Sequence, residues 1–239
     1  MRQVPAGSDT PLGIVGDGRV ARHFRQYLQL LGRPVRSWAR RSATAAPDDA
    51  LRECDTVLLL IDDRAITPFV RTWPALADKR LVHCSGALVT AVAEVAHPLM
   101  TFGEELYDLD TYRRVPFVLD EGGTPFSVLL PGLPNPSFTI RRADRPLYHA
   151  LCVLAGNYST MLWEKLFREL ELRFGIPAGA AFPYLARIAT NLQQDPFHAL
   201  TGPLGRGDAD TVRANRAALE GDPFLPVYAA FEEAYAHRA

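Results

Sequence analysis

The stretch Leu12-Gly13-Ile14-Val15-Gly16-Asp17-Gly18-Arg19-Val20-Ala21 decides the fold of this chain. A short apolar run ends abruptly at two glycines, and apolar residues then recur at helical spacing as far as Gly32. The pattern predicts a strand, a glycine turn and a helix. Gly16 permits a tight turn, Gly18 lets a pyrophosphate approach the backbone, and the small Ala21 lets the helix pack closely on the strand. A glycine turn that binds no ligand is the alternative.

The chain after Gly32 continues as alternating strands and helices. Strands are expected over 34–38, 55–61 and 80–84, with a helix before the last of them. The run Val57–Ile61 is continuously apolar, which is typical of a parallel strand buried on both faces. Two shorter runs, 116–119 and 137–140, are expected to complete the same sheet.

Beyond Arg142 the pattern is helical only, which places a domain boundary there. The predicted fold class is α/β, with a Rossmann parallel sheet domain over 1–142 followed by an all-α C-terminal domain over 143–239. One large α/β domain is also compatible with the length. Further helices are expected over 177–193, 209–220 and 224–237.

The first helix after the boundary is expected to be long, with Asp144 as its N-cap and an end at Phe174. It carries an apolar stripe that is expected to pack against the sheet domain, a second subunit or both. His149 lies opposite this stripe and is therefore expected at the surface. The stripe consists of Leu147, Leu151, Leu154, Tyr158, Met161 and Leu162.

Composition argues against several classes of protein. The formal net charge of −1 gives no broad attraction for nucleic acid or anionic lipid. Three widely spaced cysteines indicate reduced thiols rather than a disulfide framework or a metal site. No apolar run approaches the roughly 20 residues of a membrane span, and the lead-in 1–11 lacks the apolar core of a signal peptide. The expected location is cytoplasmic, without nucleic acid, membrane or metal as a partner.

The end of the second strand carries a basic pair. Arg40 and Arg41 occur there, and no acidic residue lies between Val35 and Pro47. A Rossmann fold reads the adenosine ribose at this point, where an acid would bind a free 2′-hydroxyl and guanidinium groups would bind a 2′-phosphate. The pair therefore favours NADPH over NADH. A solvated basic surface is the alternative.

Several motifs along the chain resemble a known family when they are taken in order. The sequence is similar to the uncharacterised Rossmann-like oxidoreductases with a C-terminal helical domain of unknown function. These are relatives of pyrroline-5-carboxylate reductase, ketopantoate reductase and the 6-phosphogluconate dehydrogenase type. The motifs, which span about 12 to 235, are LGIVGDGRVA, IDDRAI, VHCSGAL, HPLMTF, AGNYSTMLWEK and ALTGPLGRGDADTV.

The resemblance implies a cofactor cleft at the strand ends. It places Ser85 beside the nicotinamide and the substrate, and it turns His97 toward the same cleft, as a proton donor or as a structural imidazole. His83 is interpreted as structural. The expected cofactor-binding residues are Gly16, Asp17, Gly18, Arg19, Val20, Ala21, Arg40, Arg41, Ile61, Asp62 and Ser85.

The long helix contains Gly156-Asn157, a pair that weakens helix formation by more than about 1 kcal/mol relative to alanines. The resemblance implies that Asn157 turns its amide to the substrate or carboxamide, while a packing glycine with an interhelical hydrogen bond is the alternative. Hydroxyacid dehydrogenases of this type carry a lysine one turn earlier, where this chain has Val153. Lys165 lies too far along the helix to replace it, so the lysine-dependent mechanism is in doubt.

The stretch from Thr201 to Asp208 resembles the substrate loop of pyrroline-5-carboxylate reductase. The resemblance implies that Thr201 donates a proton or hydrogen bond and that Arg206 holds a carboxylate. An ordinary loop capping the next helix through Asp208 is the alternative.

The expected function is hydride transfer from NADPH to a C=O or C=N bond of a small carboxylate-bearing substrate, by a homodimer formed through the C-terminal helices. A catalytically silent dinucleotide-binding sensor or assembly module is the rival. A nucleotide-dependent transferase is a third hypothesis.

Overall fold

The computed structural model describes residues 10–237. Most of the lead-in 1–11 lies outside the described residues. The chain divides into two compact units, Met1–Leu162 and Trp163–Ala239. The division falls inside a helix, whereas the last strand ends at Ile140. The expected domain boundary near 142 therefore stays a prediction.

The first unit is built on a five-stranded parallel sheet with the order β2-β1-β3-β4-β5. Val15 lies level with Trp38 on one side and with Leu59 on the other, so the carboxyl ends of the strands form one edge. The strands expected around the glycine turn are confirmed, and with them the Rossmann sheet. The bounds are β1 (Leu12–Val15), β2 (Val35–Trp38), β3 (Thr56–Leu59), β4 (Arg80–His83) and β5 (Glu94–Val95).

Helices cover both faces of this sheet. The apolar face of α1 packs with Leu58 of β3 in one buried cluster, and α3 packs with Val57 and Leu59 in the other. Each fully buried Leu or Val side chain contributes about 1.5–3 kcal/mol, so β3 is held from both sides, as its continuous apolar run predicts. The helical elements here are α1 (Arg19–Leu30), α2 (Pro47–Ala50), α3 (Asp63–Thr72) and η1 (Pro74–Asp78).

A second sheet of three strands, in the order β6-β7-β8, corrects one expectation. The runs expected to complete the first sheet form β7 (Phe117–Asp120) and β8 (Ser137–Ile140), and they pair with β6 (His97–Pro98) instead. The edge of the first sheet beside β4 is occupied by β5, so β7 finds its partners elsewhere. Ala96 alone separates β5 from β6, so one residue joins the two sheets.

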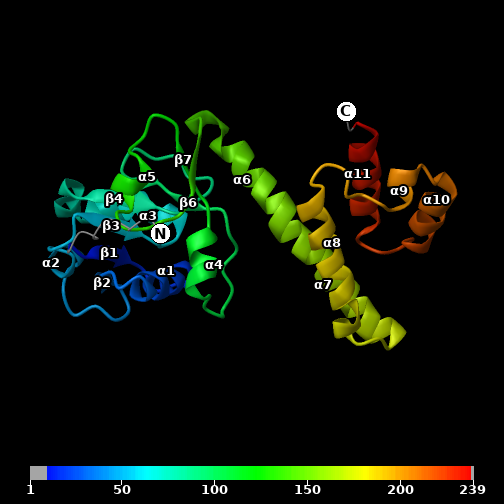
Figure 1. Cartoon of the computed structure of the whole chain (residues 1–239), viewed down its shortest axis with the longest axis horizontal. Helices are drawn as coiled ribbons and strands as arrows, with labels where there is room; N and C mark the ends of the chain where they lie inside the picture. Colours follow the sequence, from blue (N-terminus) through cyan, green and yellow to red (C-terminus); the bar gives the residue numbers. More distant parts are fainter. Residues whose placement is uncertain (1–9, 238–239) are drawn as a thin grey trace. The chain divides into compact units, whose positions relative to one another are not determined.

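Two short helices connect the strands of the second sheet along the chain. Helix α4 (Leu109–Arg114) follows β6, and α5 (Phe126–Leu129) follows β7. Helix α4 lies beside α1 (Figure 1). Tyr112 of α4 stacks on Tyr27 of α1 with 5.1 Å between the ring centroids. Asn135 accepts a hydrogen bond from the hydroxyl of Tyr27 and donates to the carbonyl oxygen of Tyr112, so the pair is fixed by buried polar contacts.

The expected long helix is confirmed, with a local irregularity. It runs as α6 (Arg145–Val153), a π-helical turn η3 (Leu154–Tyr158) and α7 (Ser159–Phe174). The turn contains the Gly156-Asn157 pair, where helix propensity is weakest, and π-turns often occur at functional sites. Asp144 is the N-cap residue of the helix, as expected, but its carboxylate accepts hydrogen bonds from Arg141 rather than from the helix amides.

The second unit is helical. Its later elements are η4 (Ala178–Ala181), α8 (Phe182–Gln194), α9 (Pro203–Arg206), α10 (Ala209–Ala218) and α11 (Leu225–Ala236). The three expected helices are confirmed, while α9 forms where a loop was expected. Trp163 of α7 packs on Tyr184 of α8 with ring centroids 5.5 Å apart. Lys165 of α7 donates to Asp222, before α11, over 2.6 Å. None of the helices within 10–237 combines the length and the apolar content of a membrane span.

Candidate active site

The glycine turn after β1 has the geometry that its sequence predicts. Gly16 has φ +123°, and a Cβ there would lie 2.2 Å from the carbonyl oxygen of Leu60, so only glycine is tolerated. Gly18 differs, because a Cβ there would meet nothing within 4 Å. The backbone at Gly18 is therefore open to a ligand. Arg25 donates from Nη1 to the carbonyl oxygen of Gly16 over 3.0 Å and holds the turn in place.

The amino end of α1 suits an anion. Gly18 is its N-cap residue, no side chain caps the helix, and its first turn contains no acid. The amide groups of the first turn and the helix dipole are therefore directed at whatever binds beside Gly18. This arrangement fits the diphosphate of a dinucleotide.

A cleft of about 470 Å³ lies at the carboxyl edge of the first sheet. The strand order changes direction between β1 and β3, which is where open α/β sheets bind their ligands. Eight of the expected cofactor-binding residues line the cleft, and Ala21 lies buried behind it in the packing position expected of it. The lining residues are Gly16, Asp17, Gly18, Arg19, Val20, Leu59, Leu60, Ile61, Asp62, Asp63, Cys84 and Ser85.

Asp62 and Ser85 also shape the walls of the cleft. Asp62 caps α3 by accepting a hydrogen bond from the backbone N–H of Arg64, and the Arg64 side chain lowers the pKa of this carboxyl. Ser85 donates to Asp63 Oδ2 over 2.5 Å and accepts from the amides of Ala87 and Leu88. The loops that follow β3 and β4 are thereby tied together.

Arg40 and Arg41 lie in the turn after β2, and both are exposed. Within residues 10–237, neither forms an ion pair. They are not among the residues that line the cleft. Their role toward a 2′-phosphate therefore stays a prediction.

His97 lies beside the loop that follows β4. Its Nδ1 shares a hydrogen bond of 2.8 Å with the hydroxyl of Tyr148, and its ring centroid lies 5.9 Å from that of His149. A Cβ on Gly86 would lie 2.9 Å from His97 Nε2 and 2.2 Å from His149 Nδ1. Both imidazoles therefore converge on Gly86, next to the cleft residue Ser85.

His83 and His97 are neutral at pH 7 because both are buried. Burial, followed by the electrostatic effects of His149 and Arg145, lowers the pKa of His97 to about 4. Burial also lowers the pKa of His83 to about 4. The backbone N–H of Ser85 donates to His83 Nδ1 over 3.2 Å, which agrees with a structural role for His83.

His149 is not the surface residue that its sequence position suggests. Its side chain is partly buried, and its Nδ1 is inaccessible to solvent and has no hydrogen-bond partner within the described part of the chain. The physical reason is that the apolar stripe does not face the sheets. Leu147, Leu151 and Leu154 of the stripe are 63%, 55% and 55% exposed, while the opposite, polar face of α6 packs inward.

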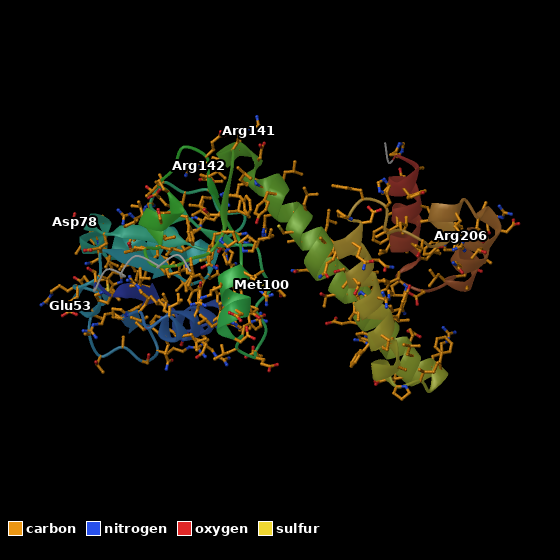
Figure 2. All side chains as sticks on the ribbon, in the orientation of Figure 1. Glu53, Asp78, Met100, Arg141, Arg142 and Arg206 are labelled. Atoms are coloured by element: carbon orange, nitrogen blue, oxygen red, sulfur yellow. The ribbon has the colours of Figure 1, made fainter. Side chains whose placement is uncertain are left out.

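A buried ion pair fixes this face of α6. Arg145 has no exposed surface and donates from Nε and Nη2 to Asp120 Oδ1 at the end of β7, over 2.8 and 2.6 Å. Arg141 and Arg142, just before α6, are solvent-facing neighbours (Figure 2). The inward positions of Arg145, Tyr148 and His149 were not expected from the sequence. Their spacing could have indicated this, because residues three and four positions apart lie on one face of a helix.

Three expected site residues do not line this cleft. Asn157 lies exposed in the π-helical turn. Thr201 and Arg206 come together in the second unit, where Arg206 Nη1 donates to the carbonyl oxygen of Thr201 over 2.7 Å. Arg206, labelled in Figure 2, is the last residue of α9. Asp208 caps α10 by accepting from the backbone N–H of Thr211, as the alternative interpretation of this loop expects. The roles of Asn157, Thr201 and Arg206 toward a substrate stay predictions.

The fold and the cleft define a Rossmann-type α/β protein with a helical C-terminal region. Residues 126–235 match the family described as "Domain of unknown function (DUF2520)". This match confirms the resemblance to a family with a C-terminal domain of unknown function, and the parallel sheet confirms its Rossmann fold. No curated protein matches the sequence.

Solved structures share the fold over nearly the whole chain. A candidate NADP oxidoreductase from Bacteroides fragilis is 18% identical, with a TM-score of 0.75, and the match covers 96% of this chain and 99% of that one. Pyrroline carboxylate reductase from Plasmodium falciparum, with NADP bound, is 11% identical, with a TM-score of 0.59 and coverage of 95% and 99%. A reductive aminase from Aspergillus terreus, in complex with NADPH and ethyl levulinate, is 16% identical, with a TM-score of 0.59 and coverage of 95% and 88%.

Proposed function

We propose that the protein binds NADPH in the cleft at the sheet edge and reduces a C=O or C=N bond of a small molecule. The observation that carries this proposal is the glycine turn. Gly16 cannot be replaced without a clash, Gly18 leaves its backbone open, and the first amides of α1 have no side-chain cap. These features fit a diphosphate.

The order of the strands indicates which part of the cofactor would lie beside each strand. The adenosine end would lie toward β2, where Arg40 and Arg41 are exposed and can neutralise a 2′-phosphate. The diphosphate would lie beside Gly18 at β1, and the nicotinamide would reach β4 near Ser85. Structural neighbours that bind NADP or NADPH support this arrangement.

The cofactor supplies hydride transfer when it is bound, and the residues of the chain position it and manage the proton. Ser85 and Asp63 hold the wall of the cleft on which the nicotinamide would lie. His97, neutral and next to that wall, is the candidate proton donor within the first unit. Asn157, Thr201 and Arg206 are proposed to contribute to the substrate site, with Arg206 binding a substrate carboxylate.

We also propose that the protein is a homodimer through its C-terminal helices. Among the described residues from 163 onward, Ala181 is the only apolar residue that is buried. The apolar stripe of α6 and α7 is exposed as well. So much exposed apolar surface is typical of a protein interface. A second copy would cover it.

Fluorescence titration tests the cofactor assignment. Purified protein is expected to bind NADPH at least about tenfold more tightly than NADH, because the 2′-phosphate gains charge-assisted hydrogen bonds. The double variant Arg40→Ala/Arg41→Ala should lose the preference and keep its affinity for NADH, and Arg113→Ala, an exposed arginine on α4, is the matched control. Equal, weak binding of both nucleotides would contradict the proposal. Tight NADPH binding without oxidation across keto acids, aldehydes and imines would favour the silent sensor.

A further inference from the structure

Arg25 of α1 lies between the glycine turn and the end of β2. Its Nη1 donates to the carbonyl oxygen of Gly16 over 3.0 Å. The backbone N–H of Gly16 donates in turn to the carbonyl oxygen of Trp38, the last residue of β2, over 2.9 Å. A single glycine therefore separates the guanidinium group from the end of β2. Arg40 follows Trp38 by two residues, so a helix and a loop each bring an arginine to this strand end.

The Arg25 side chain is open to a ligand. A hollow of about 520 Å³ lies beside β2, and both Arg25 and Ser37 line it. Arg25 is partly buried, and within residues 10–237 the contact with Gly16 is the only hydrogen bond of its guanidinium group. A guanidinium group has five N–H donors. Most of the donors of Arg25 are therefore free for a ligand.

The charge of Arg25 has no counter-ion in the described part of the chain. Two other arginines of the same helix lie beside Glu104, Arg19 at 4.0 Å and Arg22 at 2.7 Å, but no acid pairs with Arg25. Water screens a partly buried charge less than an exposed one, so such a charge attracts an anion more strongly. A phosphate would supply the missing negative charge and accept the free donors.

We propose that Arg25 is a third guanidinium group of the 2′-phosphate site, together with Arg40 and Arg41. This inference deepens the proposed function and rests on it. A Rossmann fold reads the adenosine ribose at the end of β2, which is the strand end beside Arg25. Arg25 then connects the turn that would bind the diphosphate to the phosphate that distinguishes NADPH from NADH.

A role in holding the glycine turn and a role in binding the 2′-phosphate predict different affinities. The diphosphate is common to NADPH and NADH, so a residue that only holds the turn affects both nucleotides equally. A residue that binds the 2′-phosphate affects NADPH more. The ratio of the two affinities therefore separates the roles.

Fluorescence titration of Arg25→Met measures this ratio. The substitution keeps an apolar stem and removes the charge and the donors, and it should lower the ratio of NADPH to NADH affinity at least about fivefold. Arg22→Met, one helical turn earlier, loses the same charge and is the matched control, which should leave the ratio unchanged. A smaller change in Arg25→Met overturns the inference and leaves the proposed function standing. Failure of the unchanged protein to bind NADPH overturns both.

Two isomeric probes separate a built phosphate site from general attraction. Adenosine 2′,5′-bisphosphate and adenosine 3′,5′-bisphosphate carry the same charge and differ only in the position of one phosphate. In calorimetric titrations, the unchanged protein is expected to bind the 2′,5′ isomer at least about tenfold more tightly, and Arg25→Met should lower this preference at least about fivefold. Equal binding of the isomers by the unchanged protein overturns the inference.

Two further variants separate charge from hydrogen bonding. Arg25→Lys and Arg25→Gln both keep a donor on the side chain, but only lysine keeps the positive charge. The lysine variant should keep the ratio of NADPH to NADH affinity within about threefold of the unchanged protein, whereas the glutamine variant should lose as much as Arg25→Met. Both residues favour helices, so the comparison stands even if Arg25→Met does not fold. Equal ratios for the lysine and glutamine variants overturn the inference.

Discussion

At the scale of single residues, the two glycines of the first turn have different constraints. Gly16 is confined by its left-handed backbone and by the carbonyl oxygen of Leu60, whereas Gly18 faces open space. The first is required by the fold, and the second leaves the backbone open, as the proposed diphosphate site needs.

Alanine at each glycine separates these roles. Gly16→Ala is expected to lower the free energy of unfolding by about 2 kcal/mol or more, because the added Cβ strains the backbone and clashes. Gly18→Ala should fold with nearly unchanged stability but bind NADPH about tenfold more weakly. Urea denaturation and fluorescence titration of both variants check this. A Gly18→Ala protein with full affinity would place the diphosphate elsewhere.

The neutral histidines predict a pH dependence of stability. His83 and His97 titrate near 4 when folded, against 6.5 for an ordinary imidazole. Between these values only the unfolded chain takes up the protons, so acid stabilises the unfolded state. Stability is therefore complete above about pH 6.5 and is lost as the pH falls toward 4, by about 3 kcal/mol for each histidine.

The measurement is the free energy of unfolding from pH 7.5 to 4. His97→Phe should remove its share of the slope, and Val89→Ala, at a half-exposed residue that does not ionise, should leave the slope unchanged. A profile in which His97→Phe has the same slope as the unchanged protein would show that His97 is charged in the folded state.

At the scale of elements, helix α6 depends on one buried contact. Arg145 and Asp120 join the start of the helix to the end of β7, and Arg145 has no exposed surface. Removing Arg145 takes the short ion pair from the partly buried Asp120 and leaves it only the contact with the exposed Arg142, at 3.7 Å.

Arg145→Met is expected to cost about 3–5 kcal/mol of stability and to displace Tyr148 and His149 from Gly86. Arg141→Ala breaks an exposed pair with Asp144 and should cost less than about 1 kcal/mol. Denaturation curves compare the two. Equal costs would mean that the buried pair does not anchor the helix.

Four strands of the first sheet could be predicted, because β1, β3 and β4 contain apolar runs and β2 carries the β-branched Val35 and the aromatic Trp38. The edge strand β5 could not, because Glu94 and Val95 are too few to show a period. The glycine turn, Asp62 and Ser85 could be predicted as cleft residues, since the carboxyl ends of parallel strands share one edge. His149 was misplaced because its helix was assumed to bury its apolar side, whereas it buries a polar one.

At the scale of the whole molecule, the exposed apolar stripe leads to a prediction about assembly. The double variant Leu151→Arg/Leu154→Arg should convert a dimer into a monomer, because charges cannot be buried unpaired in an interface. Val89→Arg, at a half-exposed apolar residue in a loop of the first unit, is the matched control. Analytical ultracentrifugation distinguishes the species, and a monomeric unchanged protein would contradict the proposed homodimer.

Ala96, the single residue between the two sheets, directly precedes His97, so the local stability of β5 affects the position of this imidazole. The N–H of Ala96 donates to the carbonyl oxygen of His83 over 2.9 Å, at the end of an edge strand of two residues. Short segments with few backbone hydrogen bonds can open locally without global unfolding, and opening this strand would release the imidazole of His97, which follows it. The hydrogen-exchange rate of one amide would therefore report how often the candidate proton donor leaves its place, and ligand binding should slow that exchange.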